Sequence, residues 1–244
     1  MEESETGLPA SIELAWGRRE RPGKGPRPGL SLERIVDAGV RVAAAEGLPA
    51  VSMPRVAKEL GAAPMSLYRH VAAKDELLAL MLDAACGRPP EPGPYGEGWR
   101  AGLTRWAWAL LGVWRRNPWA LGVTPPGLPT TPNQIAWMEA GLACLRPTGL
   151  DSRAKLSVML LVMGVVRNDA TMSVQFSVAS PDERKRTVAD YGRVLGSLLD
   201  EDRFPELSVL LSEGVLADDD PPDDEFAFGL DRVLDGVSAL VDGG

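Results

Sequence analysis

The chain has 244 residues, of which 45% are hydrophobic, 25% charged and 6% aromatic. This composition is typical of one or two soluble globular domains and excludes a fibrous or wholly disordered protein. The only histidine, His70, excludes a histidine-rich metal site, and the distant cysteines Cys86 and Cys144 argue against a structural zinc site and a disulfide framework.

No segment is typical of export or of a membrane span. The chain opens with the acidic residues Glu2, Glu3 and Glu5, where a signal peptide would carry basic ones. The most apolar uncharged run, residues 156–166, has 11 residues, whereas a spanning helix needs about 20. We therefore expect a cytoplasmic protein, and the absence of a recognisable cofactor motif predicts no cofactor.

The net charge of −8 conceals a basic N-terminal third. Residues 16–74 hold 11 Lys or Arg and 5 Asp or Glu, whereas residues 75–244 hold 15 and 25. This asymmetry indicates that one end of the molecule meets a polyanion such as nucleic acid, although basic faces are often only solvated.

Residues 1–29 are predicted to form a flexible basic arm. Gly, Pro and Arg dominate the stretch from Trp16 to Gly29, and such a composition does not support a helix interior. Gly23-Lys24-Gly25 lacks the glycine spacing and the following Ser or Thr of a phosphate-binding loop. The arginines of the arm, among them Arg27, would contact DNA or serve solubility alone.

Residues 30–85 contain four short predicted helices. Ser31 is the expected N-cap of the first helix, and Gly47 ends it. Ser52 is the expected N-cap of the second helix, which ends at Gly61. Further helices begin near residues 64 and 74. Two short helices joined by a tight, glycine-containing turn have the spacing of a helix-turn-helix motif.

The helix that begins at Pro64 is too short to be stable alone, so Leu67 and Val71 are expected to hold it against its neighbours. This leaves several polar side chains near the surface, namely Ser66, Tyr68, Arg69 and His70. Such residues suit contacts to phosphates and base edges better than a hydrophobic core.

Together these residues resemble the DNA-binding domain of the tetracycline-repressor (TetR) family. The resemblance covers residues 31–85 and rests on Gly47, Ser52, Val56, Ala57, Leu60, Gly61, Ser66, Leu67, Tyr68, Arg69, His70, Val71, Lys74 and Leu77. It implies that Tyr68 and Lys74 hold DNA phosphates, and that Arg69 and the residues around Pro64–Ser66 read bases. It also implies a phosphate contact from Ser52.

Each of these residues also has a structural interpretation. Tyr68 would pack half-buried, His70 would cap the end of a helix, and Lys74 would be an ordinary surface lysine. Ser52 would cap a helix with or without a phosphate contact. Apolar residues at 64 and 65 lead the recognition helix, so the operator sequence is not predicted. The candidate DNA-binding residues are Arg27, Ser52, Arg55, Pro64, Met65, Ser66, Tyr68, Arg69, His70 and Lys74.

Residues 86–244 are predicted to form a larger helical domain for effector binding and dimerisation. Helices are expected at residues 99–116, 133–145, 153–177, 183–199 and 205–213, and a last one carries residues 226–241. Residues 156–166 are apolar on nearly every side, which predicts a central, buried helix. Because no alternating strand pattern appears, the fold class is predicted to be all-α.

The last helix carries apolar residues at alternating spacings of three and four. This stripe either packs on its own domain or, as the family resemblance implies, forms a four-helix bundle with residues 153–177 between two subunits. The candidate dimerisation residues are Leu230, Val233, Leu234, Val237 and Leu240.

A pocket for a hydrophobic effector is implied by the resemblance and is compatible with seven tryptophans and eight methionines. The alternative is that most of these side chains only fill the core. Asn168 and Asp169 follow the apolar run, and a buried amide or carboxylate needs a partner, which either a ligand or a neighbouring backbone group would supply. The candidate effector-binding residues are Trp106, Trp108, Trp137, Met138, Met159, Met163 and Asn168.

We therefore predict a homodimeric, one-component transcription regulator and no enzyme. It would be a repressor that a small hydrophobic effector releases from palindromic, double-stranded operator DNA. Two alternatives stay open: an all-helical enzyme with an architectural helix-turn-helix, and an effector-free helical interaction module. The sequence has no Gly-rich phosphate loop, metal-ligand set or second histidine, but its many acidic residues leave a carboxylate-pair enzyme open.

Overall fold

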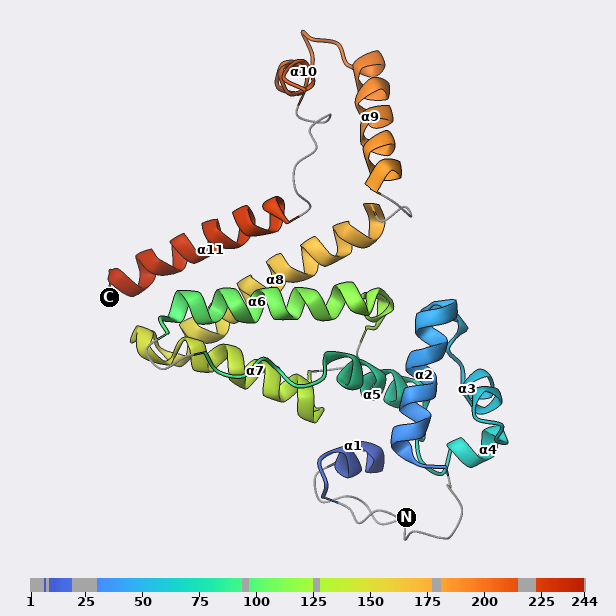
Figure 1. The fold of residues 1–244 in the computed structure, drawn as a ribbon. Coiled ribbons are helices and arrows are strands. Elements are labelled where there is room, and N and C mark those ends of the chain that lie inside the picture. The colour runs from blue at the N-terminus through green and yellow to red at the C-terminus, as the bar shows by residue number, and fades with distance from the viewer. Residues whose placement is uncertain are drawn as a thin grey trace.

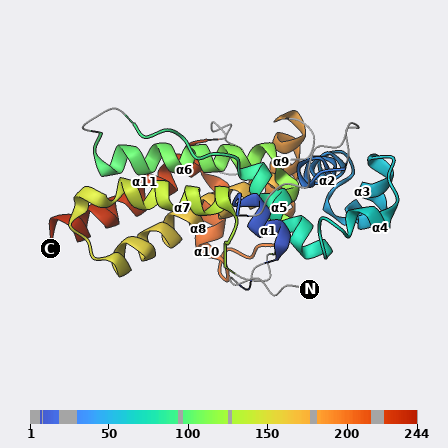
Figure 2. The same ribbon diagram turned by 90° about the horizontal axis from the view of Figure 1, so that it is seen from below.

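Every regular element in the described part of the chain is a helix (Figure 1). The computed structural model describes residue 7 and residues 9–18, 30–93, 97–124, 128–176, 181–214 and 223–243. For these residues the predicted all-α class is confirmed. Two perpendicular views place helices α2, α3 and α4 at one end of the molecule and the longer helices beside them (Figure 1, Figure 2).

Four helices form the N-terminal domain: α2 (Leu32–Glu46), α3 (Met53–Glu59), α4 (Pro64–Leu67) and α5 (Lys74–Cys86), with the 3-10 turn η1 (Leu48–Ala50) after α2. The hydroxyls of Ser31 and Ser52 each accept a backbone N–H at 3.3 Å, so both serines cap their helices as predicted. Gly47 and Gly61 follow the helix ends with φ of +82° and +62°, values that favour glycine.

Helices α2 and α5 approach each other closely. A Cβ atom on Gly39 of α2 would lie only 2.6 Å from Met81 Sδ of α5, so a larger residue there would displace the methionine. Ile35, Leu77 and Met81 are fully buried at this contact region. The two helices therefore behave as one packed unit.

The C-terminal domain consists of α6 (Trp99–Arg116), η2 (Pro118–Gly122), α7 (Pro132–Cys144), η3 (Arg146–Thr148), α8 (Ser152–Phe176), α9 (Pro181–Leu198), α10 (Pro205–Ser212) and α11 (Asp224–Asp242). The bounds of its α-helices agree with the predicted ones to within two residues. Helix α8 contacts α6, α7 and α11, whereas α9 and α10 project away from these helices (Figure 1).

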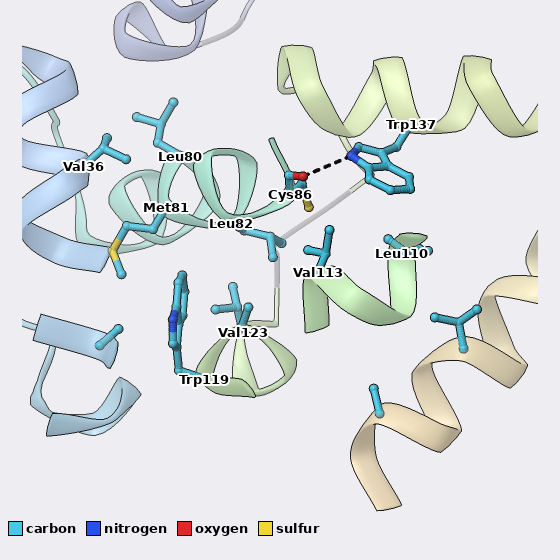
Figure 3. Packing of buried hydrophobic residues seen from close by; sticks show 14 of the residues in the cluster. Val36, Leu80, Met81, Leu82, Cys86, Leu110, Val113, Trp119, Val123 and Trp137 are labelled. Atoms are coloured by element: carbon cyan, nitrogen blue, oxygen red, sulfur yellow. Dashed lines mark hydrogen bonds between the residues drawn. The ribbon is translucent and has the colours of Figure 1, made fainter. Parts of the chain in front are cut away.

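A single hydrophobic cluster continues from one domain into the other. Figure 3 shows Met81 and Leu82 of α5 beside Trp119 and Val123, which belong to the segment after α6. The indole Nε1 of Trp137 donates to the carbonyl oxygen of Cys86 at 3.2 Å, the dashed line in Figure 3. The end of α5 is thus packed into the C-terminal domain.

The N-terminal arm differs from the prediction over residues 9–18. These residues include helix α1 (Ala10–Ala15), whose Ile12 is buried in the core cluster. Ser11 is hydrogen-bonded to Glu76 of α5, and Trp16 Nε1 donates to the carbonyl oxygen of Thr130 at 2.7 Å. This stretch is not a free arm, because its apolar face has a packing partner. The rest of the predicted arm, with Arg27, lies outside the described residues.

Helix α8 is not buried on all sides, contrary to the prediction. Val158, Val162 and Val166 are buried against the neighbouring helices, but Leu160 and Leu161 are 61% and 53% exposed. The described neighbours cover one face of α8 only, so its apolar residues on the other face have no cover among the described residues. In the described residues α8 is the one helix long and apolar enough to cross a membrane, although a packed core helix meets the same criterion.

Candidate functional site

The helix-turn-helix consists of α3, a tight turn at Gly61 and α4. The backbone N–H of Ala62 donates to the carbonyl oxygen of Ala57 at 2.9 Å and closes the turn. Leu67 and Val71 are fully buried and hold the short α4 in place, as predicted. The opposite side of α4 is consequently directed outward.

The outward side presents most of the residues predicted to contact DNA. Met65 and Tyr68 are 73% and 45% exposed, and Arg69 and Lys74 are also exposed. Among the described residues, the side chains of Tyr68, Arg69 and Lys74 have no hydrogen-bond or ion-pair partner. Long polar side chains that are held on one face without internal partners are suited to bind an external one. Pro64 is exposed as well, while Ser66 and His70 are half-buried.

Arg55 differs from this group. Its Nη2 atom lies 2.5 Å from Glu46 Oε1, and its Nη1 atom lies 3.1 Å from Glu59 Oε2. Hydrogen bonding to Arg55 lowers the pKa of Glu46, and the same bonds raise the pKa of the arginine. The guanidinium is therefore already neutralised by two carboxylates, which does not fit the predicted free DNA contact. Ser52 is a cap, and its hydroxyl hydrogen stays available to an acceptor.

The C-terminal domain contains a cleft of about 780 Å³ between α6, α7 and the segment before α6. Proline, alanine and tryptophan side chains form its walls, among them Pro89, Trp106 and Ala140. Charged side chains also line it, namely Arg88, Glu91, Glu97, Arg105, Glu139 and Arg146. The volume is within the range of about 300–1,000 Å³ that small-molecule sites occupy.

Two charged residues that line this cleft, Arg105 and Glu97, form an ion pair. Arg105 Nη2 lies 2.6 Å from Glu97 Oε2, and Arg105 Nε donates to Glu97 Oε1 at 3.2 Å. Hydrogen bonding to Arg105 lowers the pKa of Glu97 below the ordinary value of 4.5. Cys144 also lines the cleft, and burial raises the pKa of its thiol.

Of the seven residues predicted to line an effector site, Trp106 alone lines this cleft. Its Nε1 donates to the carbonyl oxygen of Trp137 at 2.9 Å, and the two rings meet edge to face. Trp108 packs on Phe226 with ring centroids 4.6 Å apart, and Met159 is buried. Trp108, Trp137 and Met159 therefore fill the core and do not line the cleft.

The remaining three predicted residues lie elsewhere. Met138 is half-buried outside the cleft lining, and Met163 and Asn168 are exposed on the bare face of α8. Asp169 is partly buried, with its carboxylate 3.4 Å from Arg115. The expected buried amide without a protein partner is therefore not present in the described structure.

The lining that sequence reasoning missed comes from small residues. Ala136, Ala140 and Ala143 recur at helical spacing along α7, and Gly102 faces them from α6. A Cβ atom on Gly102 would lie 3.2 Å from Cys144 Sγ. The sequence signal for this cleft is the combination of small residues at helical spacing in α7 with the proline-rich segment before α6.

The dimerisation stripe also differs from the prediction. Leu230, Leu234 and Val237 are at most 2% exposed, because they pack against the chain's own helices. They therefore cannot line a seam between two subunits. Val233 is half-buried, whereas Leu240 and Phe228 on the outer side of α11 are 58% and 64% exposed.

Two family models match the chain. One, described as bacterial regulatory proteins of the tetR family, matches residues 35–81. The other, described as a tetracyclin repressor-like C-terminal domain, matches residues 91–241. The HTH-type transcriptional repressor DrrR1 of Streptomyces coeruleorubidus is 39% identical over 236 residues, which cover 95% of this chain and 86% of DrrR1.

Solved structures of ActR from Streptomyces coelicolor have the same fold. The ActR complex with actinorhodin gives a TM-score of 0.75 at 27% identity, with 87% of this chain and 99% of ActR covered. The ActR complex with (S)-DNPA gives a TM-score of 0.72 at 28% identity and covers the same shares of the two chains.

Proposed function

The chain belongs to the TetR family of bacterial transcriptional regulators, and on that basis we propose that it is a homodimeric repressor that a small, largely apolar effector releases from palindromic operator DNA. The observation that carries this proposal is the row of exposed side chains in the turn after α4 and at the start of α5. Tyr68, Arg69 and Lys74 are held there by a rigid scaffold and have no partner among the described residues.

The residues of this row have different proposed tasks. Tyr68 and Lys74 bind phosphates, which adds affinity for any sequence, and Arg69 hydrogen-bonds to base edges, which selects a sequence. Ser52 adds a phosphate contact at the start of α3. Met65 offers an apolar surface to thymine methyl groups. Because a DNA-binding regulator acts where the DNA is, we propose a cytoplasmic location.

A second copy of the chain would cover the bare face of α8. This face carries Leu156, Leu160 and Leu161, and it lies next to α11 with its exposed Phe228 and Leu240. A Cβ atom on Gly164 of α8 or Gly236 of α11 would meet nothing within 4 Å, so a partner helix has room to approach. Two subunits joined here would present two α4 helices to two half-sites of one operator.

The cleft beside Trp106 is the proposed effector site. Its volume is sufficient for a drug-sized molecule, its proline and alanine side chains and Trp106 favour an apolar body, and its charged lining residues can bind polar substituents. ActR, which has the same fold, binds actinorhodin and (S)-DNPA, and these two compounds are the natural first probes. An effector that prefers the DNA-free arrangement by about 2–3 kcal/mol would lower operator affinity roughly 30- to 150-fold.

The proposal is tested by DNA-binding measurements on the purified protein. A duplex selected by the protein from a random library should bind as a dimer, with affinity that falls steeply as salt is added. Addition of actinorhodin, (S)-DNPA or a compound found in an apolar library should release the duplex. A protein that selects no duplex would contradict the repressor, and selection without release by any compound would favour the effector-free module.

A further inference from the structure

Asp83 stands where α5 meets the C-terminal domain. It is only 8% exposed, and its carboxylate is directed at the N-terminus of α7. Oδ1 accepts the backbone N–H groups of Asn133 at 2.8 Å and Gln134 at 3.1 Å, and Oδ2 accepts Asn133 Nδ2 at 3.0 Å. The carbonyl oxygen of Asp83 accepts the same amide group at 3.1 Å.

These bonds give α7 an N-cap that comes from another helix. The first residue of α7 is Pro132, which has no N–H, so Asn133 and Gln134 carry the first free donors of the helix. Thr131 occupies the N-cap position but accepts no capping hydrogen bond. Its hydroxyl oxygen is buried without a partner among the described residues. Asp83 therefore performs the task that a local cap performs elsewhere.

One end of this link lies at the proposed effector cleft, and α5 connects its other end to the proposed DNA surface. Asn133 and Ala136, in the first turn of α7, line the cleft. Helix α5 begins at Lys74 beside the proposed DNA surface and is packed against α2. A second contact, from Trp137 Nε1 to the carbonyl oxygens of Cys86 and Gly87, joins the same helices near the end of α5.

We infer that Asp83 is a positioning residue that couples the cleft to the DNA-reading helices. Because its carboxylate ties the first turn of α7 to α5, any displacement of that cleft wall moves α5 and, with it, the packed α2. The inference rests on the proposed repressor function. Coupling between two sites is reciprocal, so DNA binding must also change the affinity of the cleft for its ligand, and we expect the α7 N-terminus to respond to DNA.

The test moves the carboxylate from one side of the junction to the other. In the double variant Asp83→Ala/Thr131→Asp, α7 receives a cap of its own and the link to α5 is lost. The single variant Asp83→Ala lacks both the cap of α7 and the link to α5. Asp37→Ala removes an exposed carboxylate of α2 and serves as the matched control. The local cap protects α7 from fraying, so the double variant separates a coupling role from a merely stabilising one.

The readout is hydrogen exchange at the backbone amides of Asn133 and Gln134, with and without a duplex that the wild-type protein selects from a random library. In the wild type and in Asp37→Ala, DNA should change these exchange rates at least about fivefold, the lower end of usual coupling strengths. In the double variant, saturated with the same duplex, the change should be less than about twofold.

Two results would overturn the inference while leaving the repressor function intact. One is a DNA-induced change in the double variant equal to that in the wild type, which would make Asp83 only a cap. The other is a wild-type protein that binds the duplex with no change at Asn133 and Gln134. If no duplex is bound at all, the proposed function itself fails and the inference fails with it.

Discussion

Two arginines of the helix-turn-helix domain have the same charge but different surroundings. Arg55 is bonded to Glu46 and Glu59, whereas Arg69 is exposed and has no partner among the described residues. A guanidinium that is already bonded to two carboxylates must break these bonds before it binds a phosphate. The free energy lost with the carboxylates offsets most of the free energy gained with the phosphate. Charge and spacing in the sequence make both residues candidates, and the structure separates them because the acidic partners come from α2 and the far end of α3.

The exposed row gives a prediction for single side chains. Tyr68→Ala and Lys74→Ala should each weaken DNA binding by about 1–2 kcal/mol on all sequences, and Lys74→Ala should reduce the salt slope by roughly one. Arg69→Ala should instead reduce the preference for the selected duplex over a scrambled one. Fluorescence anisotropy titrations at several salt concentrations measure all three effects.

The control for these variants is Arg116→Ala, which removes one exposed positive charge at the end of α6, in the other domain. Its affinity and salt slope should match the wild type. Unchanged binding in Tyr68→Ala, Lys74→Ala and Arg69→Ala alike would show that DNA is not bound through α4 and α5.

The ion pair at the cleft predicts a pH dependence of stability. Hydrogen bonding to Arg105 holds the pKa of Glu97 below 4.5 in the folded chain, so the carboxylate is stabilised in its charged form. The stabilisation is fully present above the unfolded pKa and is lost as the pH falls through the lower folded value. The melting temperature of Glu97→Gln should therefore lie below that of the wild type near about pH 7 and approach it near about pH 3. If the difference in melting temperature between Glu97→Gln and the wild type is constant across this pH range, the Glu97–Arg105 ion pair is not its source.

At the scale of single elements, the sequence predicts what is encoded locally. The helix bounds follow from caps such as Ser31 and Ser52 and from the period of the apolar residues, so they agree closely with the structure. Helix α1 does not follow from the local sequence, because Ile12 is buried by residues distant in the chain. The heptad-like period of α11 predicts that one face is buried, but it does not specify whether the same chain or a partner covers it.

The buried face of α11 gives a prediction about stability. Leu234→Ala should lower the free energy of unfolding by about 2–5 kcal/mol, because it leaves a cavity where the leucine is fully buried against the rest of the domain. Urea denaturation measures the loss, and size-exclusion chromatography should still find the native oligomer. Leu128→Ala, which truncates a leucine that is 89% exposed, should change stability by less than about 0.5 kcal/mol. Equal effects of the two variants would contradict the packing of α11 described above.

On the scale of the whole molecule, the uncovered apolar surface is concentrated on one helix. Leu156, Leu160, Leu161 and Met163 of α8 are each at least 41% exposed, and they lie on the side that α6 and α11 leave free. Large exposed apolar surfaces are typical of interaction sites, which supports the proposed subunit interface on α8. In the proposed dimer α8 would lie at the centre, and a helix in that position is apolar around most of its circumference, which accounts for its meeting the length and composition of a membrane span.

The dimer is therefore best tested on α8 rather than on the buried stripe of α11. Leu160→Glu places a charge on a residue that is 61% exposed in the single chain, so the subunit should fold normally. In the dimer the same charge would be buried without a partner, at a cost of several kcal/mol, and light scattering at micromolar concentration should find monomers. Because each monomer then binds one half-site independently, affinity for the full operator should fall by roughly 10²- to 10⁴-fold. Leu128→Glu adds the same charge at an exposed leucine away from α8 and should stay dimeric with full affinity. A dimeric Leu160→Glu protein that binds the operator normally would place the subunit interface elsewhere on the molecule.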